Sequence, residues 1–404
     1  MLTTIEIELN HGSDISLIKL VDALIDHAYQ CQASDIHIDP TRTDIRIRFR
    51  IDGLLQEIIR LPQSIKAEII ARLKVLSHLR TDEHQLAQDG RFTMQSQTGL
   101  PIDVRISIAP TYYGENAMLR LLTAQQKIFS LENLGFDVND QRQITKALEQ
   151  PYGMILATGP TGSGKTTTLY SLLRIFNKPE VSIITIEDPI EYAVDNITQI
   201  QVNPRHGLTF ANGLRNLLRQ DPNVIMVGEI RDAETADITI NAALTGHRVL
   251  SSLHTSTAAT TLPRLIDMRI EPYLIAATVT LAIGQRLVRT LCQNCATRQQ
   301  PSNMLWQNLP LTVREFFATL DTNFLYQANG CQLCHNTGYH GRTGIYEVLT
   351  IDALLREAFL RKASAREIQR IATTNGMKTM LYDGLTKAVK GITTVQEVLR
   401  IIND

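Results

Sequence analysis

The sequence predicts an α/β protein of two domains, and three observations support this prediction. The chain has 404 residues, enough for two or three domains. Its first third alternates apolar and polar residues, as in a half-exposed sheet. From Gly153 onward, short apolar runs alternate with helical segments, which is typical of a parallel sheet covered on both faces. Hydrophobic residues make up 44% of the chain, as expected for a globular protein with ample core.

Residues 1–123 are predicted to form the smaller, α+β domain. In DIRIRFRID, residues 44–52, period two places the apolar side chains on one face and three arginines on the other. A second strand, PIDVRISIAP at 101–110, repeats this pattern. Between the two strands, residues 64–79 have helical spacing, and Ser64 is predicted to be the N-cap.

Residues 124–404 are predicted to form the larger domain around four buried strands. The runs MILAT, VSIITI, VIMV and VLSSL are continuous and apolar, as strands buried on both faces should be. The uncharged stretch 272–285 is too short to cross a bilayer and predicts a buried helix. A cysteine-bearing subdomain is expected at 290–345, and a helical region at 350–404.

The first chemical motif is a phosphate-binding loop. GPTGSGKT, residues 159–166, matches G-x-x-x-x-G-K-[ST] in full between a predicted strand and a predicted helix. Lys165 would reach the β- and γ-phosphates, and the Thr166 hydroxyl would coordinate Mg²⁺. The nearest match to the guanine-reading N-K-x-D is NKPE at 177–180, which lacks the aspartate, so ATP is favoured over GTP. The predicted nucleotide-binding residues are Gly159, Pro160, Thr161, Gly162, Ser163, Gly164, Lys165, Thr166 and Thr167.

Polar side chains follow three other predicted strands. Glu187 and Asp188 end the second run, Glu229 follows the third run after Gly228, and His254 follows the fourth. Because the carboxyl ends of parallel strands meet at one edge of a sheet, we expect these side chains to lie together beside the phosphate loop. The sequence therefore predicts a functional site at this edge of the sheet, beside the phosphate loop.

The five cysteines are Cys31, predicted to be a small buried residue, and two CxxC pairs separated by 35 residues. The N-terminus MLTTIEIELN has no features of an export signal, so the pairs indicate metal or redox chemistry more than disulfides. Four thiolates close a tetrahedral shell, which favours structural Zn²⁺ over a redox role, with His335 and His340 outside the shell. The predicted zinc ligands are Cys292, Cys295, Cys331 and Cys334.

These motifs resemble those of a known family. GPTGSGKTTTLY, ITIEDPIEY, LRQDPNVIMVGEIRD and TGHRVLSSLHT are similar to the Walker A, Asp box, Walker B and His box of the secretion ATPases, which drive type II secretion and type IV pilus assembly. The resemblance extends from SDIHIDP to the tail. It implies a RecA-like P-loop NTPase motor domain, a PAS-like N-terminal domain that covers the nucleotide, and a homohexamer.

The resemblance also implies roles for individual residues. Glu229 would be the general base for the attacking water, and the acids beside it would orient waters on Mg²⁺. Arg105 and Arg120 match arginines that reach the γ-phosphate, whereas Arg215 and Arg219 match arginines near the subunit interface. The residues implied to act in catalysis are Glu229, Glu187, Asp188, His254, Arg105 and Arg120.

The implied function is ATP hydrolysis that powers assembly of a type II secretion pseudopilus or a type IV pilus. The paired CxxC resembles the secretion and pilus-extension branch, and the AIRNLIRE stretch typical of retraction relatives is absent from the sequence. The implied location is the cytoplasm at the inner membrane, where the chain would act through a platform protein and a docking protein. The usual extra N-terminal docking domain is not matched, because the chain begins almost at once with the nucleotide-covering domain.

Three alternatives remain at this stage. They are a DNA-uptake or retraction motor, a nucleotide-binding regulator with little turnover, and a nucleic-acid translocase. The net charge of −1 argues against direct nucleic-acid binding, because such proteins carry an excess of basic residues.

Overall fold

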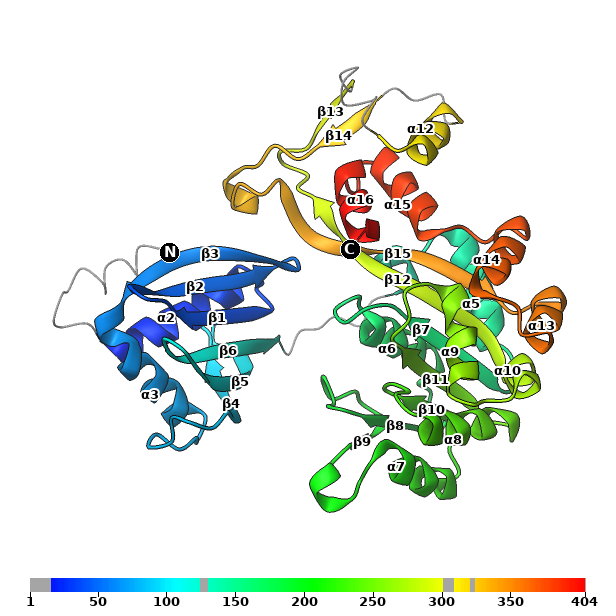
Figure 1. Ribbon diagram of the computed structural model, residues 1–404, viewed down its shortest axis with the longest axis horizontal. Helices are drawn as coiled ribbons and strands as arrows, with labels where there is room; N and C mark the ends of the chain where they lie inside the picture. Colours follow the sequence, from blue (N-terminus) through cyan, green and yellow to red (C-terminus); the bar gives the residue numbers. More distant parts are fainter. Residues whose placement is uncertain (1–15, 124–129, 301–308, 320–323, 404) are drawn as a thin grey trace. The chain divides into compact units, whose positions relative to one another are not determined.

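The computed structural model describes residues 16–123, 130–300, 309–319 and 324–403. The chain divides into two compact units, Met1–Gln126 and Lys127–Asp404, and each is described by itself (Figure 1). The predicted domain boundary at 123/124 borders residues outside the described part, and the N-terminus that was searched for an export signal lies outside it as well. Among the described helices, none is long and apolar enough to cross a bilayer.

The N-terminal unit is a six-stranded antiparallel sheet in the order β3-β2-β1-β6-β5-β4. Its helices pack with the inward-facing residues of the sheet in one hydrophobic cluster. The strands are β1 (Asp35–Pro40), β2 (Asp44–Ile51), β3 (Leu54–Pro62), β4 (Gln88–Gln95), β5 (Pro101–Thr111) and β6 (Gly114–Thr123). The helices are α2 (Leu17–Gln30), the short 3₁₀ turn η2 (Gln63–Ile65) and α3 (Lys66–Leu76).

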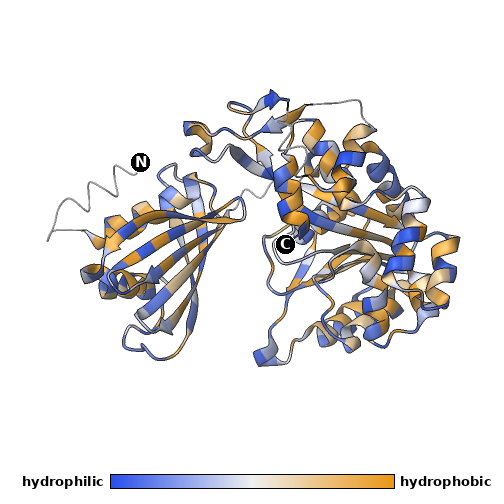
Figure 2. Ribbon diagram, turned by 45° about the horizontal axis from the view of Figure 1, so that its top comes forward, coloured by the Kyte–Doolittle hydropathy of each residue, from blue (hydrophilic) through white to orange (hydrophobic). Residues whose placement is uncertain are grey.

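The predicted alternation in this unit is confirmed. Ile45, Ile47 and Phe49 of β2 are buried, and the residues between them are more exposed; Figure 2 shows the same alternation of hydropathy along the strands. The predicted N-cap is wrong. Ser64 lies inside η2, and α3 starts at Lys66 without a side-chain cap, because the chain enters this helix through the tighter turn.

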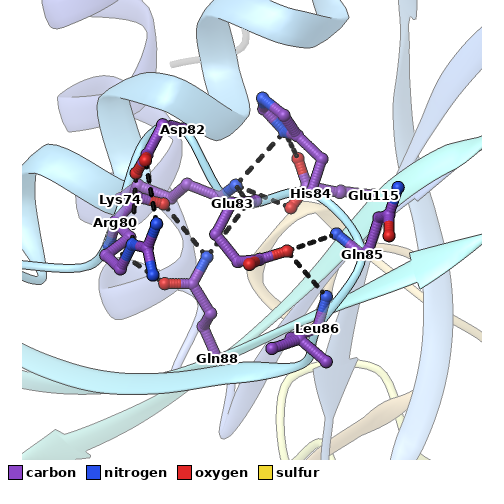
Figure 3. Close-up of polar contacts among 9 residues, drawn as sticks. All are labelled: Lys74, Arg80, Asp82, Glu83, His84, Gln85, Leu86, Gln88 and Glu115. Carbon is purple, nitrogen blue, oxygen red and sulfur yellow. Dashed lines mark hydrogen bonds and ion pairs between the residues drawn. The ribbon is translucent and has the colours of Figure 1, made fainter.

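The loop after α3 is held by a buried ion pair (Figure 3). The ammonium of Lys74, which is fully buried, lies 2.7 Å from Glu115 Oε1 and donates a 2.5 Å hydrogen bond to the carbonyl of Glu83. His84 Nδ1 lies 2.8 Å from the other oxygen of Glu115. Because a buried charge is costly unless it is paired and hydrogen-bonded, these contacts fix the loop against the start of β6.

The second unit is built on a seven-stranded sheet in the order β15-β12-β7-β11-β10-β8-β9. All neighbouring strands are parallel except β12 and β15. The strands are β7 (Gly153–Thr158), β8 (Ile183–Glu187), β9 (Thr198–Gln201), β10 (Val224–Val227), β11 (Arg248–Leu253), β12 (Val279–Leu291) and β15 (Tyr339–Thr350). The four predicted runs correspond to β7, β8, β10 and β11 and are confirmed.

Helices cover both faces of this sheet. Alternate strand residues belong to two hydrophobic clusters, one containing α5 and α6 and the other containing α7 to α10, α13 and α14. The helices between the start of this unit and β12 are α4 (Leu131–Leu134), α5 (Val138–Leu148), α6 (Lys165–Phe176), η3 (Pro204–His206), α7 (Phe210–Leu217), η4 (Leu218–Gln220), α8 (Ala233–Leu244), η5 (Ala258–Thr260), α9 (Thr261–Asp267) and α10 (Pro272–Thr278).

The predicted helix at 272–285 is wrong in its second half. The helix α10 ends at Thr278, and Val279 begins the 13-residue strand β12. Because β12 lies between β7 and β15 and is buried on both faces, its sequence lacks the period-two pattern that distinguishes a strand from a buried helix.

The remaining elements lie in the cysteine-bearing region and in the C-terminal helical tail. The region carries β13 (Thr297–Gln299) paired with β14 (Leu325–Gln327), α12 (Leu311–Ala318) and the turn η6 (Gln332–Cys334). The tail consists of α13 (Ala353–Leu360), α14 (Ala365–Thr374), α15 (Met380–Val389) and α16 (Val395–Asn403).

Candidate nucleotide and metal sites

The phosphate loop joins β7 to α6, as the sequence predicts. Gly159, Gly162 and Gly164 have φ values of 150°, 78° and 87°, which favour glycine because a β-carbon is strained there. A β-carbon on Gly159 would also lie 2.4 Å from the carbonyl oxygen of Gln285. Gly164 is the N-cap of α6, so the loop leads directly into the helix end whose unpaired N–H groups attract anions.

Lys165 is the first residue of α6, and its side chain lies over the loop. Its Nζ donates hydrogen bonds to the carbonyl oxygens of Gly159 (2.8 Å) and Pro160 (2.9 Å). Burial lowers the pKa of Lys165, and the negative charge of Glu229 acts in the opposite direction. The loop therefore holds a buried cation within electrostatic reach of Glu229, a carboxylate that follows β10, two strands away in the sheet.

Three of the four predicted polar residues come together at the carboxyl ends of the strands. Glu229 Oε2 lies 2.9 Å from His254 Nε2, and Glu229 Oε1 lies 2.5 Å from Arg231 Nη2. Arg231 Nη1 also lies 3.7 Å from Asp188 Oδ2. Burial raises the pKa of Glu229, but hydrogen bonds from Arg231 and His254 outweigh it and hold the pKa below its usual value. Glu229 is therefore a carboxylate at neutral pH.

Glu187 is not brought into this cluster. It is the last residue of β8, and its side chain is only 2% exposed. Its oxygens accept hydrogen bonds from Thr185 (2.6 Å), Gln199 (3.2 Å) and the hydroxyl of Tyr170. Successive strand residues point to opposite sides, so Asp188 is exposed at the edge of the sheet whereas Glu187 joins a buried network with α6.

Gly228 stands where many P-loop ATPases carry a metal-binding aspartate. Its N–H donates a 2.8 Å hydrogen bond to the carbonyl of Ile186 on β8. A β-carbon at this position would lie 3.3 Å from that same oxygen and 3.4 Å from the α-carbon of Glu187. These are tight contacts, so a side chain here would press on β8.

Arg231 and Gln285 belong to the site but were not predicted. Arg231 lies two residues after Glu229, and its charge within the sequence GEIRD is the feature from which its place in the site could have been predicted. Gln285 lies more than a hundred residues beyond the loop that it contacts, within a stretch that was read as helix. No sequence pattern indicates a contact at that distance along the chain.

Arg105 and Arg120 lie in the N-terminal unit, directly opposite each other on β5 and β6. Arg120 is about half exposed, and its Nε lies 3.1 Å from the buried carboxylate of Asp35. Both arginines are on the face of the sheet opposite the hydrophobic cluster. The predicted contact with the γ-phosphate stays a prediction.

Arg215 and Arg219 are exposed on α7 and η4 and line an open depression at the surface. Arg215 Nη2 lies 2.7 Å from Glu234 Oε1, and Arg219 donates a 3.0 Å hydrogen bond to the carbonyl of Arg215. Their predicted place near a subunit interface also stays a prediction.

The four cysteines of the CxxC pairs converge at one point. Their sulfur atoms all lie within 4.8 Å of one another, and three of the distances are 3.7 to 3.8 Å. A regular tetrahedron of zinc–sulfur bonds of about 2.3 Å has sulfur–sulfur edges of about 3.8 Å. The four cysteines are free of disulfides, so the geometry fits a closed tetrahedral zinc site. Among the described residues, these four cysteines are the only cluster of possible metal ligands, and the cluster includes neither His335 nor His340.

Comparison with known proteins shows similarity over nearly the whole chain. A family model described as "Type II/IV secretion system protein" matches residues 10–400. The type II secretion system protein E of Xanthomonas campestris pv. campestris is 44% identical over 393 residues, which cover 97% of this chain and 68% of the relative. The type IV pilus assembly ATPase PilB of Myxococcus xanthus is 42% identical over 388 residues, covering 96% and 68%.

Solved structures show the same fold. The Legionella pneumophila ATPase DotB superposes with a TM-score of 0.68 at 25% identity, covering 95% of each chain. The pilus retraction motor PilT with bound ADP superposes with a TM-score of 0.60 at 24% identity, covering 94% of this chain and 96% of that one. The predicted RecA-like fold class is thereby confirmed.

Proposed function

The chain belongs to the type II/IV secretion system protein family, and on this premise we propose that it is an ATPase that powers assembly of a pilus or pseudopilus. The observation that carries the proposal is the cluster of Glu229, His254, Asp188 and Arg231 beside a complete phosphate loop. The reaction is the hydrolysis of ATP to ADP and phosphate.

The residues of the phosphate loop bind the nucleotide in this proposal. The backbone N–H groups of the loop from Thr161 to Thr167 would surround the phosphates, and the ammonium of Lys165 would move from the loop carbonyls onto the β- and γ-phosphates. Thr166 is on the first turn of α6, where its hydroxyl can serve as a ligand of Mg²⁺. Bound Mg²⁺ would neutralise charge on the phosphate oxygens.

Glu229 acts as the general base. Its carboxylate accepts a proton from the attacking water, and the hydrogen bonds from His254 and Arg231 hold it in one orientation. Asp188 orients water at the exposed edge of the site. Glu187 would not contact the water directly, because its oxygens already accept hydrogen bonds from Tyr170, Thr185 and Gln199.

The finer parts of the proposal follow from the family. Arg105 and Arg120 would stabilise the transferred phosphoryl group, and Arg215 and Arg219 would contact a neighbouring subunit of a homohexamer. The hexamer would work in the cytoplasm at the inner membrane, joined to a platform protein and a docking protein of the machine. The four cysteines would bind a structural Zn²⁺ that stiffens the region between β12 and β15.

A substitution of Lys165 tests the proposal in cells. Lys165→Ala removes the cation that binds the phosphates, so cells with this variant should lose surface filaments or secreted protein while keeping normal levels of the chain. Lys178→Ala, just beyond the same helix, is the matched control and should leave assembly intact. Filaments and secretion at wild-type levels with Lys165→Ala would contradict the proposal. DNA-stimulated hydrolysis or loss of DNA uptake alone would favour the DNA-uptake motor instead.

A further inference from the structure

Gln285 is a buried polar residue beneath the phosphate loop. It lies on β12, is 1% exposed, and is hydrogen-bonded on both sides of its amide group. In sequence it is about 120 residues from its two partners. β12 pairs with β7, the strand that leads into the loop, and their register ends with Gly284 opposite Thr158. Gln285 is therefore the next residue beyond that pairing, level with the start of the loop.

Both halves of the amide are used. Nε2 donates a 2.8 Å hydrogen bond to the carbonyl oxygen of Ser163, and Oε1 accepts a 2.8 Å hydrogen bond from the hydroxyl of Thr168. The carbonyl oxygen of Ser163 can only accept, so the NH₂ end of the amide must face it, and the Thr168 hydroxyl then donates to the oxygen end. The side chain thus links the tip of the loop to the first turns of α6.

This contact determines the direction of one loop N–H group. The peptide bond between Ser163 and Gly164 is trans, so its C=O and N–H groups point in opposite directions. Because the C=O of Ser163 is held toward β12, the N–H of Gly164 points away from the sheet. That is the open side of the loop, where Thr161 and Gly162 are exposed and where a bound anion would meet the helix N-terminus.

We propose that Gln285 is a positioning residue that holds the Ser163–Gly164 peptide in the orientation required to bind nucleotide phosphates. This inference rests on the proposed nucleotide site and adds a residue to it. A glutamate could not replace this glutamine, because a carboxylate has no proton to donate to Ser163 and would repel its carbonyl oxygen. The peptide would then turn over and present an oxygen to the phosphates.

The test compares nucleotide affinity among variants of the full chain. Gln285→Glu is nearly isosteric but replaces the donor with a charged acceptor, so the Kd for a fluorescent ATP analogue should rise at least about 10-fold, as for a lost hydrogen bond to a buried group. Gln285→Met introduces no charge and should also weaken binding. Thr280→Val is the matched control, since Thr280 donates from the same strand to Met154 on β7, away from the loop; its Kd should stay within about 2-fold.

Thermal unfolding without nucleotide separates positioning from a loss of fold. The inference requires that at least one Gln285 variant unfold near the wild-type temperature and still bind poorly. It is overturned if a folded Gln285→Glu or Gln285→Met binds as tightly as the wild type, or if Thr280→Val weakens binding equally. A wild type that binds but does not hydrolyse ATP would count against the proposed function while leaving this inference intact. A wild type that binds no nucleotide would overturn both.

Discussion

Replacement of Asp140 by asparagine should stabilise the second unit at alkaline pH and have a smaller effect at acidic pH. Asp140 is in the first turn of α5 and is 6% exposed. Burial, together with the charge of Asp137, raises its pKa to about 6. The two nearby lysines are already paired, Lys378 with Asp137 and Lys387 with Asp383.

The sign follows from proton binding. The pKa of an aspartate in the unfolded chain is about 3.9, so between about pH 4 and pH 6 the folded state binds more protons than the unfolded state. The free energy of unfolding of the wild type therefore falls as the pH rises through this window. The difference of about two pKa units corresponds to about 3 kcal/mol, or roughly 2 kcal/mol after allowance for solvent screening.

The assay is chemical unfolding of the wild type and Asp140→Asn at pH 4.5 and at pH 8. The variant should be more stable by roughly 2 kcal/mol at pH 8 and by less than about 1 kcal/mol at pH 4.5, where part of the effect is already present because an unfolded aspartate is mostly ionised. Asp237→Asn, at an exposed position of α8, should show no such dependence. An Asp140→Asn variant that is destabilised at pH 8, or that differs from the wild type equally at both pH values, would refute the reasoning.

Three further predictions follow from the two sites. The purified chain should contain about one zinc per molecule, and a strong chelator should lower its unfolding temperature; absence of bound metal together with no chelator effect would contradict the Cys₄ assignment. Arg231→Ala should raise the pKa of Glu229, because burial is then opposed by fewer hydrogen bonds, and the acid limb of the pH profile of kcat should move to higher pH; a shift to lower pH would be inconsistent with the pairing. Tyr170→Phe should destabilise the chain by about 1–3 kcal/mol, because it leaves a buried oxygen of Glu187 with one donor fewer. An unchanged free energy of unfolding would show that this hydrogen bond does not stabilise the chain.

The parts of the site that the sequence predicts are those made by local patterns. The phosphate loop depends on glycines, a lysine and a threonine within eight residues, so its conformation is encoded where it forms. Glu229 and His254 were placed correctly because each follows a strand whose apolar run is unmistakable, and parallel strands end at one edge.

The parts that were missed depend on long-range packing. Gln285 contacts the loop only because β12 pairs with β7, and the sequence of β12 has no alternation to identify it as a strand. Glu187 and Asp188 are neighbours in sequence, and only the direction of β8 at its last residue determines which one is buried. Lys74 of α3 is buried as an ion pair whose partner, Glu115, lies on β6, about 40 residues further along the chain.

The central claim is that Glu229 is the general base of a working ATPase. The measurement is steady-state ATP hydrolysis with Mg²⁺ for the wild type and Glu229→Gln, on protein whose oligomeric state is established by sizing. We expect the wild type to hydrolyse ATP, and the variant to bind ATP but lose roughly 10²-fold or more of the rate, as the loss of a general base requires. Equal rates for the two proteins would contradict the mechanism, and a wild type without turnover would favour a nucleotide-binding regulator.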